Sequence, residues 1–185
     1  VGVTLHHPHG QIYAFTYLPP VPERELQSAA AYLEDYKGGC LFCSVVIGEQ
    51  QDNRRVVLRN DSFIAFVPFA ARYPYEIHLY SLEHRPSLAD LNDREMDDLA
   101  AILQSLVRCY DNLFGKPFPY IMVVHQEPAK QRNGLGHLHF EFYPPLRDFA
   151  KLKYLAGCEQ GAGTFINDSL PEEKAAELRK AAKVV

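Results

Sequence analysis

Apolar side chains change their spacing from one segment of the chain to the next, and each spacing predicts a secondary structure. Two segments repeat apolar residues every three or four positions, as on the buried face of a helix. One covers about residues 23–37; the other begins at Asn92, with Glu95 completing a capping box, and ends at Gly115. A surface helix rich in Glu, Ala and Lys is predicted over 171–183. The buried stripe of the middle helix is predicted to comprise Met96, Leu99, Leu103, Leu106, Val107 and Tyr110.

Runs of β-branched and aromatic residues surround these helices and predict strands. Residues 1–5 and 11–18 are predicted to be extended, and three prolines follow them. The later predicted strands are Val45–Ile47, Arg55–Leu58, Phe63–Val67, Tyr75–Tyr80, Tyr120–Val124 and His137–Tyr143. Turn residues separate most of them, so the predicted fold class is α+β, with an antiparallel sheet and one long helix. No glycine-rich phosphate loop follows a strand, which excludes dinucleotide-binding and P-loop folds.

Length, composition and charge limit the class of protein. The 185 residues, of which 47% are hydrophobic and 23% charged, are expected to form one globular domain with an appendage. A net charge of -4 without a basic block disfavours nucleic acid as a partner. No apolar run reaches the roughly 18–20 residues of a membrane helix, so no membrane partner is expected. The chain shows no signal-peptide pattern, which favours a cytoplasmic location, where paired cysteines bind metal more often than they form disulfides.

Two short stretches, His7–Gln11 and His137–Glu141, share the pattern His-x-His-x-(Gln/Glu). Residues two apart in a strand point to the same face, so each stretch is predicted to place three polar side chains together. Burying such groups without partners is costly, which favours a functional role for at least one stretch. Imidazole can act as a nucleophile, a base or a metal ligand, and an amide such as that of Gln11 can donate to a phosphate oxygen. The pattern therefore favours phosphoryl or nucleotidyl transfer through a covalent histidine.

Cys40 and Cys43 form a Cys-x-x-Cys pair, which can supply two ligands to a tetrahedral zinc ion. No zinc-finger spacing follows, so the remaining ligands must come from distant strands, and His84 and His137 are candidates. Inert thiols and a redox pair stay open as alternatives, although the βαβ context of a thioredoxin-like site is missing. His78 alternates with apolar residues in its predicted strand and is interpreted as structural.

The segment His7–Ile12 closely resembles the active-site motif of the galactose-1-phosphate uridylyltransferase family, which is part of the histidine triad superfamily. Three further segments carry the resemblance: Asp111–Phe114, Phe118–Tyr120 and Phe142–Leu146. Members of this family contain two similar histidine triad halves in tandem. The resemblance implies that residues 1–37 are the end of the first half, with its catalytic strand and linker helix. It also implies that residues 38–185 are the second half, a histidine-triad-like antiparallel sheet with a C-terminal helical tail.

The resemblance implies an enzyme of galactose metabolism, a nucleotidyltransferase with a covalent uridylyl-histidine. His9 would attack the α-phosphorus of UDP-glucose and release glucose-1-phosphate; galactose-1-phosphate would then take the uridylyl group to give UDP-galactose. The positions that match the family's substrate-binding residues are Gly2, Thr4, Gln11, Lys153 and Glu159. Gln11 would stabilise the phosphoryl oxygens. In the family, the positions of Lys153 and Glu159 contact the hexose phosphate across a homodimer interface. The implied partners are therefore a UDP-sugar, a hexose-1-phosphate and a second copy of the chain.

The resemblance also implies zinc as a cofactor, with iron as an alternative metal. His7 matches a ligand of the zinc site in the first half, whose other ligands would lie upstream of Val1. One branch of the family has another zinc site, which maps onto Cys40, Cys43, His84 and His137. Members without the Cys-x-x-Cys bind a metal through one Glu and three His, which map onto Glu25, His125, His139 and Glu141. Glu141 departs from this pattern, because those members have a histidine at its position. Phe165 occupies the position of a Gln that recognises the hexose in the family.

Two other functions stay open. The first is an adenylyltransferase or ADP-sugar phosphorylase that uses the same His9, because the branch with the additional zinc site includes enzymes that act on ADP-sugars. The second is a zinc-stabilised module that is inactive when alone. We also expect the strands within residues 1–18 to need sheet partners upstream, because an exposed apolar edge promotes aggregation.

Overall fold

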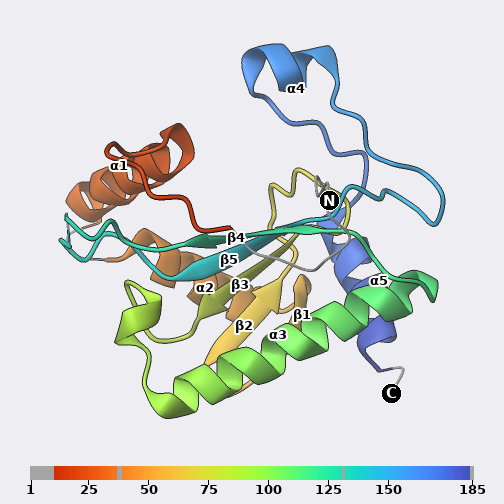
Figure 1. The fold of residues 1–185 in the computed structure, drawn as a ribbon, viewed down its shortest axis with the longest axis horizontal. Helices are drawn as coiled ribbons and strands as arrows, with labels where there is room; N and C mark the ends of the chain where they lie inside the picture. Colours follow the sequence, from red (N-terminus) through yellow and green to blue (C-terminus); the bar gives the residue numbers. More distant parts are fainter. Residues whose placement is uncertain (1–10, 37–38, 131, 184–185) are drawn as a thin grey trace.

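The computed structural model describes residues 11–36, 39–130 and 132–183. Five strands form one antiparallel sheet in the order β1-β2-β3-β5-β4, which confirms the predicted α+β class (Figure 1). The strands are β1 (Val56–Arg59), β2 (Phe63–Phe66), β3 (Ile77–Ser81), β4 (Ile121–His125) and β5 (His139–Tyr143). The helices are α1 (Pro20–Asp35), α2 (Leu41–Asp52), α3 (Asp93–Phe114), α4 (Gly157–Ala162) and α5 (Pro171–Ala182), and a short 3-10 helix spans Leu88–Asp90.

Helices cover both faces of the sheet, so successive residues of a strand enter different apolar layers (Figure 1). The layer under α3 and α5 includes Leu79, Leu106, Tyr110, Phe142 and Leu178. The layer under α1 and α2 includes Ala29, Phe42, Val46, Ile64, Phe66 and Tyr80. In this second layer the rings of Phe42 and Tyr80 stack on His139. The histidine motif of β5 therefore lies on the face that α1 and α2 cover.

The long helix α3 has the ends that the sequence predicts. The Asn92 side chain accepts from the Glu95 amide at 2.9 Å, and the Glu95 carboxylate accepts from the Asn92 amide at 2.8 Å, which confirms the capping box. Gly115 ends the helix at a φ of 62°, in the left-handed region that favours glycine. Met96 was predicted to be buried but is 47% exposed. The neighbouring Glu95 is buried instead, because its side chain pairs with Arg85 and caps the helix. None of the described helices is long and apolar enough to cross a membrane.

The prediction of a strand at Val45–Ile47 is wrong, because this segment lies within α2. Cys40 caps the helix, its sulfur accepting from the amide of Cys43. Val46 is buried against the sheet, whereas Ile47 is 52% exposed. A run of β-branched residues favours a strand locally, but packing against the sheet overrides that preference.

Residues 11–18 form no strand, although their composition predicts one. Ile12 is fully exposed and Tyr13 is 69% exposed. A strand needs a partner for its backbone groups, and no strand of the described sheet pairs with this segment. The predicted strand over residues 1–5 lies outside the described residues, and the division of the chain at residue 37 stays a prediction.

The helical state of α2 predicts unequal effects for two alanine substitutions. Val46→Ala removes a side chain that is 2% exposed and is expected to lower the free energy of unfolding by about 2 kcal/mol. Ile47→Ala removes an exposed side chain and is expected to change it by less than about 0.5 kcal/mol. Urea unfolding followed by circular dichroism measures both. A strand would bury Val45 and Ile47 together, so a larger loss for Ile47→Ala would contradict the helix.

Candidate metal centres

Four potential metal ligands meet at the start of α2. One ligand atom from each of Cys40, Cys43, His84 and His137 lies within 4.8 Å of the others. The sulfur of Cys43 is 3.5 Å from Nδ1 of both His84 and His137. A tetrahedral zinc ion with Zn–S of about 2.3 Å and Zn–N of about 2.0 Å has sulfur–nitrogen edges of about 3.5 Å. The four residues, hereafter the Cys/His cluster, therefore fit a zinc ion.

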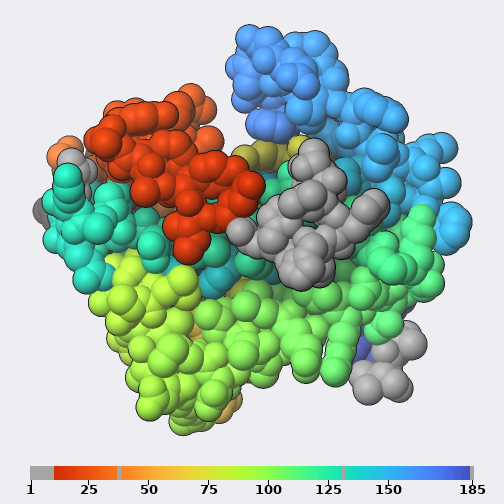
Figure 2. All heavy atoms as spheres, in the orientation of Figure 1, coloured from red at the N-terminus to blue at the C-terminus, as the bar shows by residue number. Residues whose placement is uncertain are grey.

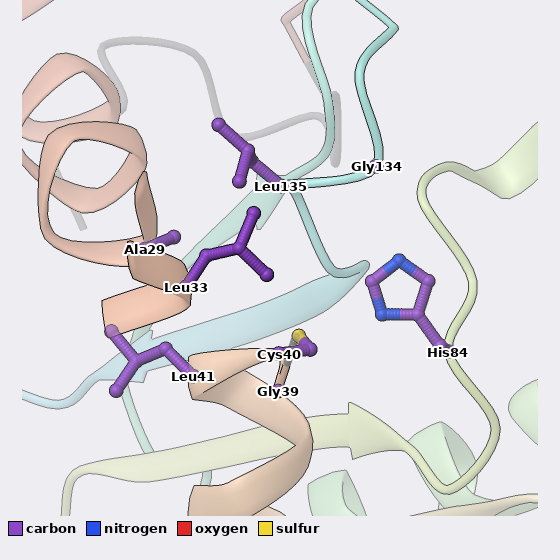
Figure 3. A pocket seen from close by; sticks show the side chains of 8 residues that line it. All are labelled: Ala29, Leu33, Gly39, Cys40, Leu41, His84, Gly134 and Leu135. Carbon is purple, nitrogen blue, oxygen red and sulfur yellow. The ribbon is translucent and has the colours of Figure 1, made fainter. Parts of the chain in front are cut away.

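The Cys/His cluster draws its residues from three segments that the fold brings together. Cys40 and Cys43 lie at the cap and first turn of α2. His84 follows β3 and His137 precedes β5, and these two strands are neighbours in the sheet. Cys40 and His84 face one pocket, which Ala29 of α1 also lines (Figure 3). The site thus depends on β3–β5 pairing and on the packing of α1 and α2.

A hydrogen bond to the main chain of Ser81 fixes which ring nitrogen of buried His137 carries the proton. Its Nε2 lies 2.9 Å from the Ser81 carbonyl oxygen, so Nε2–H donates there and Nδ1 keeps its lone pair toward Cys43. Burial lowers the pKa of His137 to about 4. Burial, together with the neighbouring Cys40, raises the pKa of the Cys43 thiol to about 12. A divalent cation would supply the positive charge that a thiolate at this position needs.

A second group of ligand atoms lies on the same face of the sheet. Glu25, His125, His139 and Glu141 each place one ligand atom within 4.8 Å of the others. His125 and His139 are directly opposite in the pairing of β4 with β5, and Glu141 follows His139 on the same face. Glu25 reaches them from α1, with its Oε2 2.9 Å from Nδ1 of His125. These four residues are hereafter the Glu/His cluster.

Glu141 carries the clearest sign that a cation fits the Glu/His cluster. Its side chain is buried, and its Oε2 atom has no hydrogen-bond partner among the described residues. A buried polar atom without a partner costs about 1–3 kcal/mol, which a bound cation would remove. Where the family pattern has a histidine, Glu141 thus still offers a ligand atom. Two carboxylates and two imidazoles suit a divalent cation.

The two histidines of the Glu/His cluster differ electrostatically. Nδ1 of His139 is 2.8 Å from the carbonyl oxygen of His137, so Nδ1–H donates there and Nε2 faces the cluster. Burial lowers the pKa of His139 well below its ordinary value, so this ring is neutral at pH 7, as a metal ligand must be. Burial also acts to lower the pKa of His125, but the hydrogen bond and charge of Glu25 outweigh it and raise that pKa.

Of the predicted substrate-binding residues, Glu159 lies in α4, which projects from the body of the molecule, and Lys153 lies in the segment before it (Figure 2). Nζ of Lys153 is 2.9 Å from Oε1 of Glu159. Glu159 also accepts from the amides of Ala156 and Ile166. The amides and Lys153 together lower the pKa of Glu159 to about 2. The two residues therefore form an ion pair within the chain.

Several of the predicted site residues lie outside the described residues, namely Gly2, Thr4, His7 and His9. Gln11 is the first described residue; it is exposed, and its side-chain oxygen accepts from the Tyr13 hydroxyl. The nucleophile and the ligand from the first half therefore stay predictions.

His78, interpreted from the sequence as structural, has a role beside the Glu/His cluster, because it contacts one of the residues in it. Its Nε2 lies 2.9 Å from Oε1 of Glu76 and 3.3 Å from Oε1 of Glu141. His78 and Glu141 are directly opposite in the pairing of β3 with β5. Two polar residues at a spacing of two, Glu76 and His78, are the signal in the sequence that could have revealed this role.

The fold of this chain is similar to that of known histidine triad proteins. A Zn-bound histidine triad family protein from Mycobacterium smegmatis superimposes with a TM-score of 0.53 at 19% identity, over 78% of this chain and 93% of that one. This chain thus has a histidine-triad-like fold. A family model described as "Galactose-1-phosphate uridyl transferase, C-terminal domain" matches residues 25–184. The chain belongs to the galactose-1-phosphate uridylyltransferase family.

The matched relatives are longer than this chain. Galactose-1-phosphate uridylyltransferase of Thermotoga maritima is 40% identical over 182 residues, covering 97% of this chain and 56% of the relative. A solved uridylyltransferase structure superimposes with a TM-score of 0.91 at 41% identity, over 98% of this chain and 57% of that one. An ADP-glucose phosphorylase from Arabidopsis thaliana superimposes with a TM-score of 0.74 at 26% identity, over 89% of this chain and 49% of that one. This chain spans about half the length of these relatives.

Replacing one ligand of the Cys/His cluster is expected to remove its metal. Cys43→Ser is expected to lower the zinc content by about one equivalent per chain, because a tetrahedral site needs all four donors. Inductively coupled plasma mass spectrometry of purified protein measures this. Cys158→Ser is the matched control, since Cys158 is exposed on α4 and belongs to neither cluster. Equal zinc contents in the two variants would contradict the ligand assignment.

The low pKa of His137 predicts that metal-free protein loses stability in acid. Between its ordinary pKa of 6.5 and about 4, this histidine binds a proton only in the unfolded state. Stability is therefore expected to fall as the pH drops from 6.5 to 5, by about 2 kcal/mol at roughly 1.4 kcal/mol per pH unit. Urea unfolding after chelation, at pH 7 and pH 5, measures the loss. His137→Gln should show a smaller pH dependence, and identical profiles for both proteins would refute the explanation.

Proposed function

We propose that this chain is part of an enzyme that moves a uridylyl group between UDP-glucose and galactose-1-phosphate. The observation that carries the proposal is the match to the Thermotoga maritima enzyme at 40% identity over 97% of this chain. In this proposal, residues 1–37 are the end of one histidine triad half and residues 38–185 are the next half. Because the chain spans about half of its relatives, the activity is proposed for the natural protein that contains it.

His9 is the proposed nucleophile. Its imidazole nitrogen forms a bond to the α-phosphorus of UDP-glucose while the bond from that phosphorus to the departing glucose-1-phosphate breaks. A phosphate oxygen of galactose-1-phosphate then attacks the same phosphorus, and the phosphorus–nitrogen bond breaks to release UDP-galactose and free imidazole. The covalent intermediate divides one displacement into two similar ones. Gln11, two residues further on, is proposed to donate its amide N–H to the phosphoryl oxygens without adding charge.

The hexose phosphate is proposed to bind near Lys153, in a homodimer located in the cytoplasm. The ion pair with Glu159 restricts the position of the Lys153 ammonium. Such an ammonium attracts a phosphate, and a second copy of the chain would complete the site. Gly2 and Thr4 are proposed to supply the remaining phosphate contacts from the other half.

The two clusters are proposed to hold the helices α1 and α2 against the sheet. Zinc is the proposed metal of the Cys/His cluster, and its role is structural because four protein ligands leave no position for substrate. A divalent cation, zinc or iron, is proposed for the Glu/His cluster. There Glu25 of α1 meets His125 of β4, and α1 directly follows the segment 11–18 that leads from His9. The Glu/His cluster would thus fix where the catalytic segment joins the sheet. His7 is proposed as a zinc ligand of the first half.

Trapping the covalent intermediate tests the function. The natural protein that contains this chain is incubated with UDP-glucose, and peptide mass mapping is expected to locate a UMP adduct on His9, with release of glucose-1-phosphate. His9→Asn should form no adduct, because an amide is not a nucleophile. His6→Asn is the matched control, because it changes a neighbouring histidine outside the motif and should keep the adduct.

Other nucleotides separate the alternatives. An AMP adduct from ADP-glucose, without a UMP adduct from UDP-glucose, would replace the proposal with the adenylyl reaction, for which the resemblance to ADP-glucose phosphorylase is the supporting observation. No adduct from either nucleotide in protein with a full zinc content would indicate an inactive module.

A further inference from the structure

A histidine lies between two buried carboxylates beside the Glu/His cluster. Nε2 of His78 is 2.9 Å from Oε1 of Glu76 and 3.3 Å from Oε1 of Glu141. Glu76 is 1% exposed and Glu141 is 3% exposed. Two carboxylates so close in a poorly solvated place repel each other unless a donor separates them. His78 is hydrogen-bonded to Glu76 and in ion-pair contact with Glu141, so its ring is placed to offset this repulsion.

Glu76 is held by the main chain and serves to orient His78. Its Oε2 accepts from the amides of Arg72 at 2.6 Å and Tyr73 at 3.0 Å, while its Oε1 faces the imidazole. Both oxygens of Glu76 are therefore used within the chain. Glu76 fixes the direction of the His78 ring and keeps no oxygen for a cation.

The two oxygens of Glu141 face different surroundings. Oε1 is nearest to His78, which is directly opposite in the β3–β5 pairing, and it lies 3.8 Å from Nε2 of His139. Oε2 has no hydrogen-bond partner among the described residues, and it lies 3.7 Å from Nε2 of His125 and 3.7 Å from the Arg72 guanidinium. The contact with His78 thus turns Oε2 toward the other members of the Glu/His cluster.

We propose that His78, oriented by Glu76, is a positioning residue for the Glu/His cluster. It holds Oε1 of Glu141 so that Oε2, the oxygen without a hydrogen-bond partner among the described residues, is the one offered to a divalent cation. Carboxylate ligands are commonly fixed in this way, by a hydrogen bond to the oxygen that does not bind the metal, and losing such a partner weakens metal affinity. The inference rests on the proposal that the cluster binds a divalent cation, and it does not depend on the chemistry of His9.

Mn2+ binding to the natural protein tests this role. Mn2+ prefers carboxylate and imidazole over thiolate, so it reports on the Glu/His cluster after zinc has filled the Cys/His cluster. Electron paramagnetic resonance of free and bound Mn2+ gives the affinity and the symmetry of the site. His78→Leu is expected to weaken Mn2+ binding by about 10–100-fold and to change the bound spectrum. His78→Gln, which keeps a donor, should restore most of the affinity.

Two further variants keep the test decisive. Ile77→Ala damages the same strand from its opposite, fully buried face and should leave the Mn2+ affinity nearly unchanged. If His78→Leu fails to fold, Glu76→Gln is the variant to measure instead. Its new amide donates to Nε2 of His78, so this nitrogen no longer offers a proton to Glu141. Weaker Mn2+ binding is therefore expected.

Three results would overturn the positioning role. They are unchanged Mn2+ affinity in a folded His78→Leu or Glu76→Gln protein, equal losses in His78→Leu and Ile77→Ala, and wild-type protein that binds no Mn2+ at the Glu/His cluster. The last result would also remove the cation from the proposed function. The UMP adduct on His9 is measured separately, so uridylyl transfer could still stand.

Discussion

The position of β5 between β3 and β4 is the constraint on which both clusters depend. In this register His139 is opposite His125, and Glu141 follows on the same face. A slip of one residue would turn these polar side chains toward α3 and bring apolar ones under α1. Phe140 and Phe142 oppose the slip, because both are buried in the larger apolar layer. One alternation of residues therefore builds the larger apolar layer on one face of the sheet, and the ligand clusters beside the smaller layer on the other.

Elements that depend on neighbouring residues were predictable, and those that depend on distant partners were not. The cap at Asn92 and the stop at Gly115 act over a few positions, so both ends of α3 follow from the sequence. The segment Val45–Ile47 has the composition of a strand, but the sheet beneath Val46 decides in favour of a helix. Residues 11–18 lack a partner strand in the described sheet, and composition alone cannot supply one.

The candidate site shows the same division between local chemistry and distant geometry. The Cys-x-x-Cys favoured a pair of metal ligands, but the spacing alone left inert thiols and a redox pair open as alternatives. His84 and His137 were candidates to join Cys40 and Cys43, the resemblance to a family favoured the same two residues, and the structure places them beside the cysteines. The role of His78 depends on which residue faces it across β3 and β5, and strand register is a property of the folded sheet.

One hydrogen bond connects the two clusters through the main chain. Nδ1 of His139 donates to the carbonyl oxygen of His137, whose own side chain belongs to the Cys/His cluster. Any amino acid at position 137 supplies that carbonyl group. In evolution, the cysteines and the His137 imidazole can therefore be replaced while His139 keeps its orientation. An insertion or deletion just before β5 would displace the carbonyl group and so disturb both clusters. Substitutions can therefore change one cluster without the other, whereas a change in the length of the segment before β5 affects both.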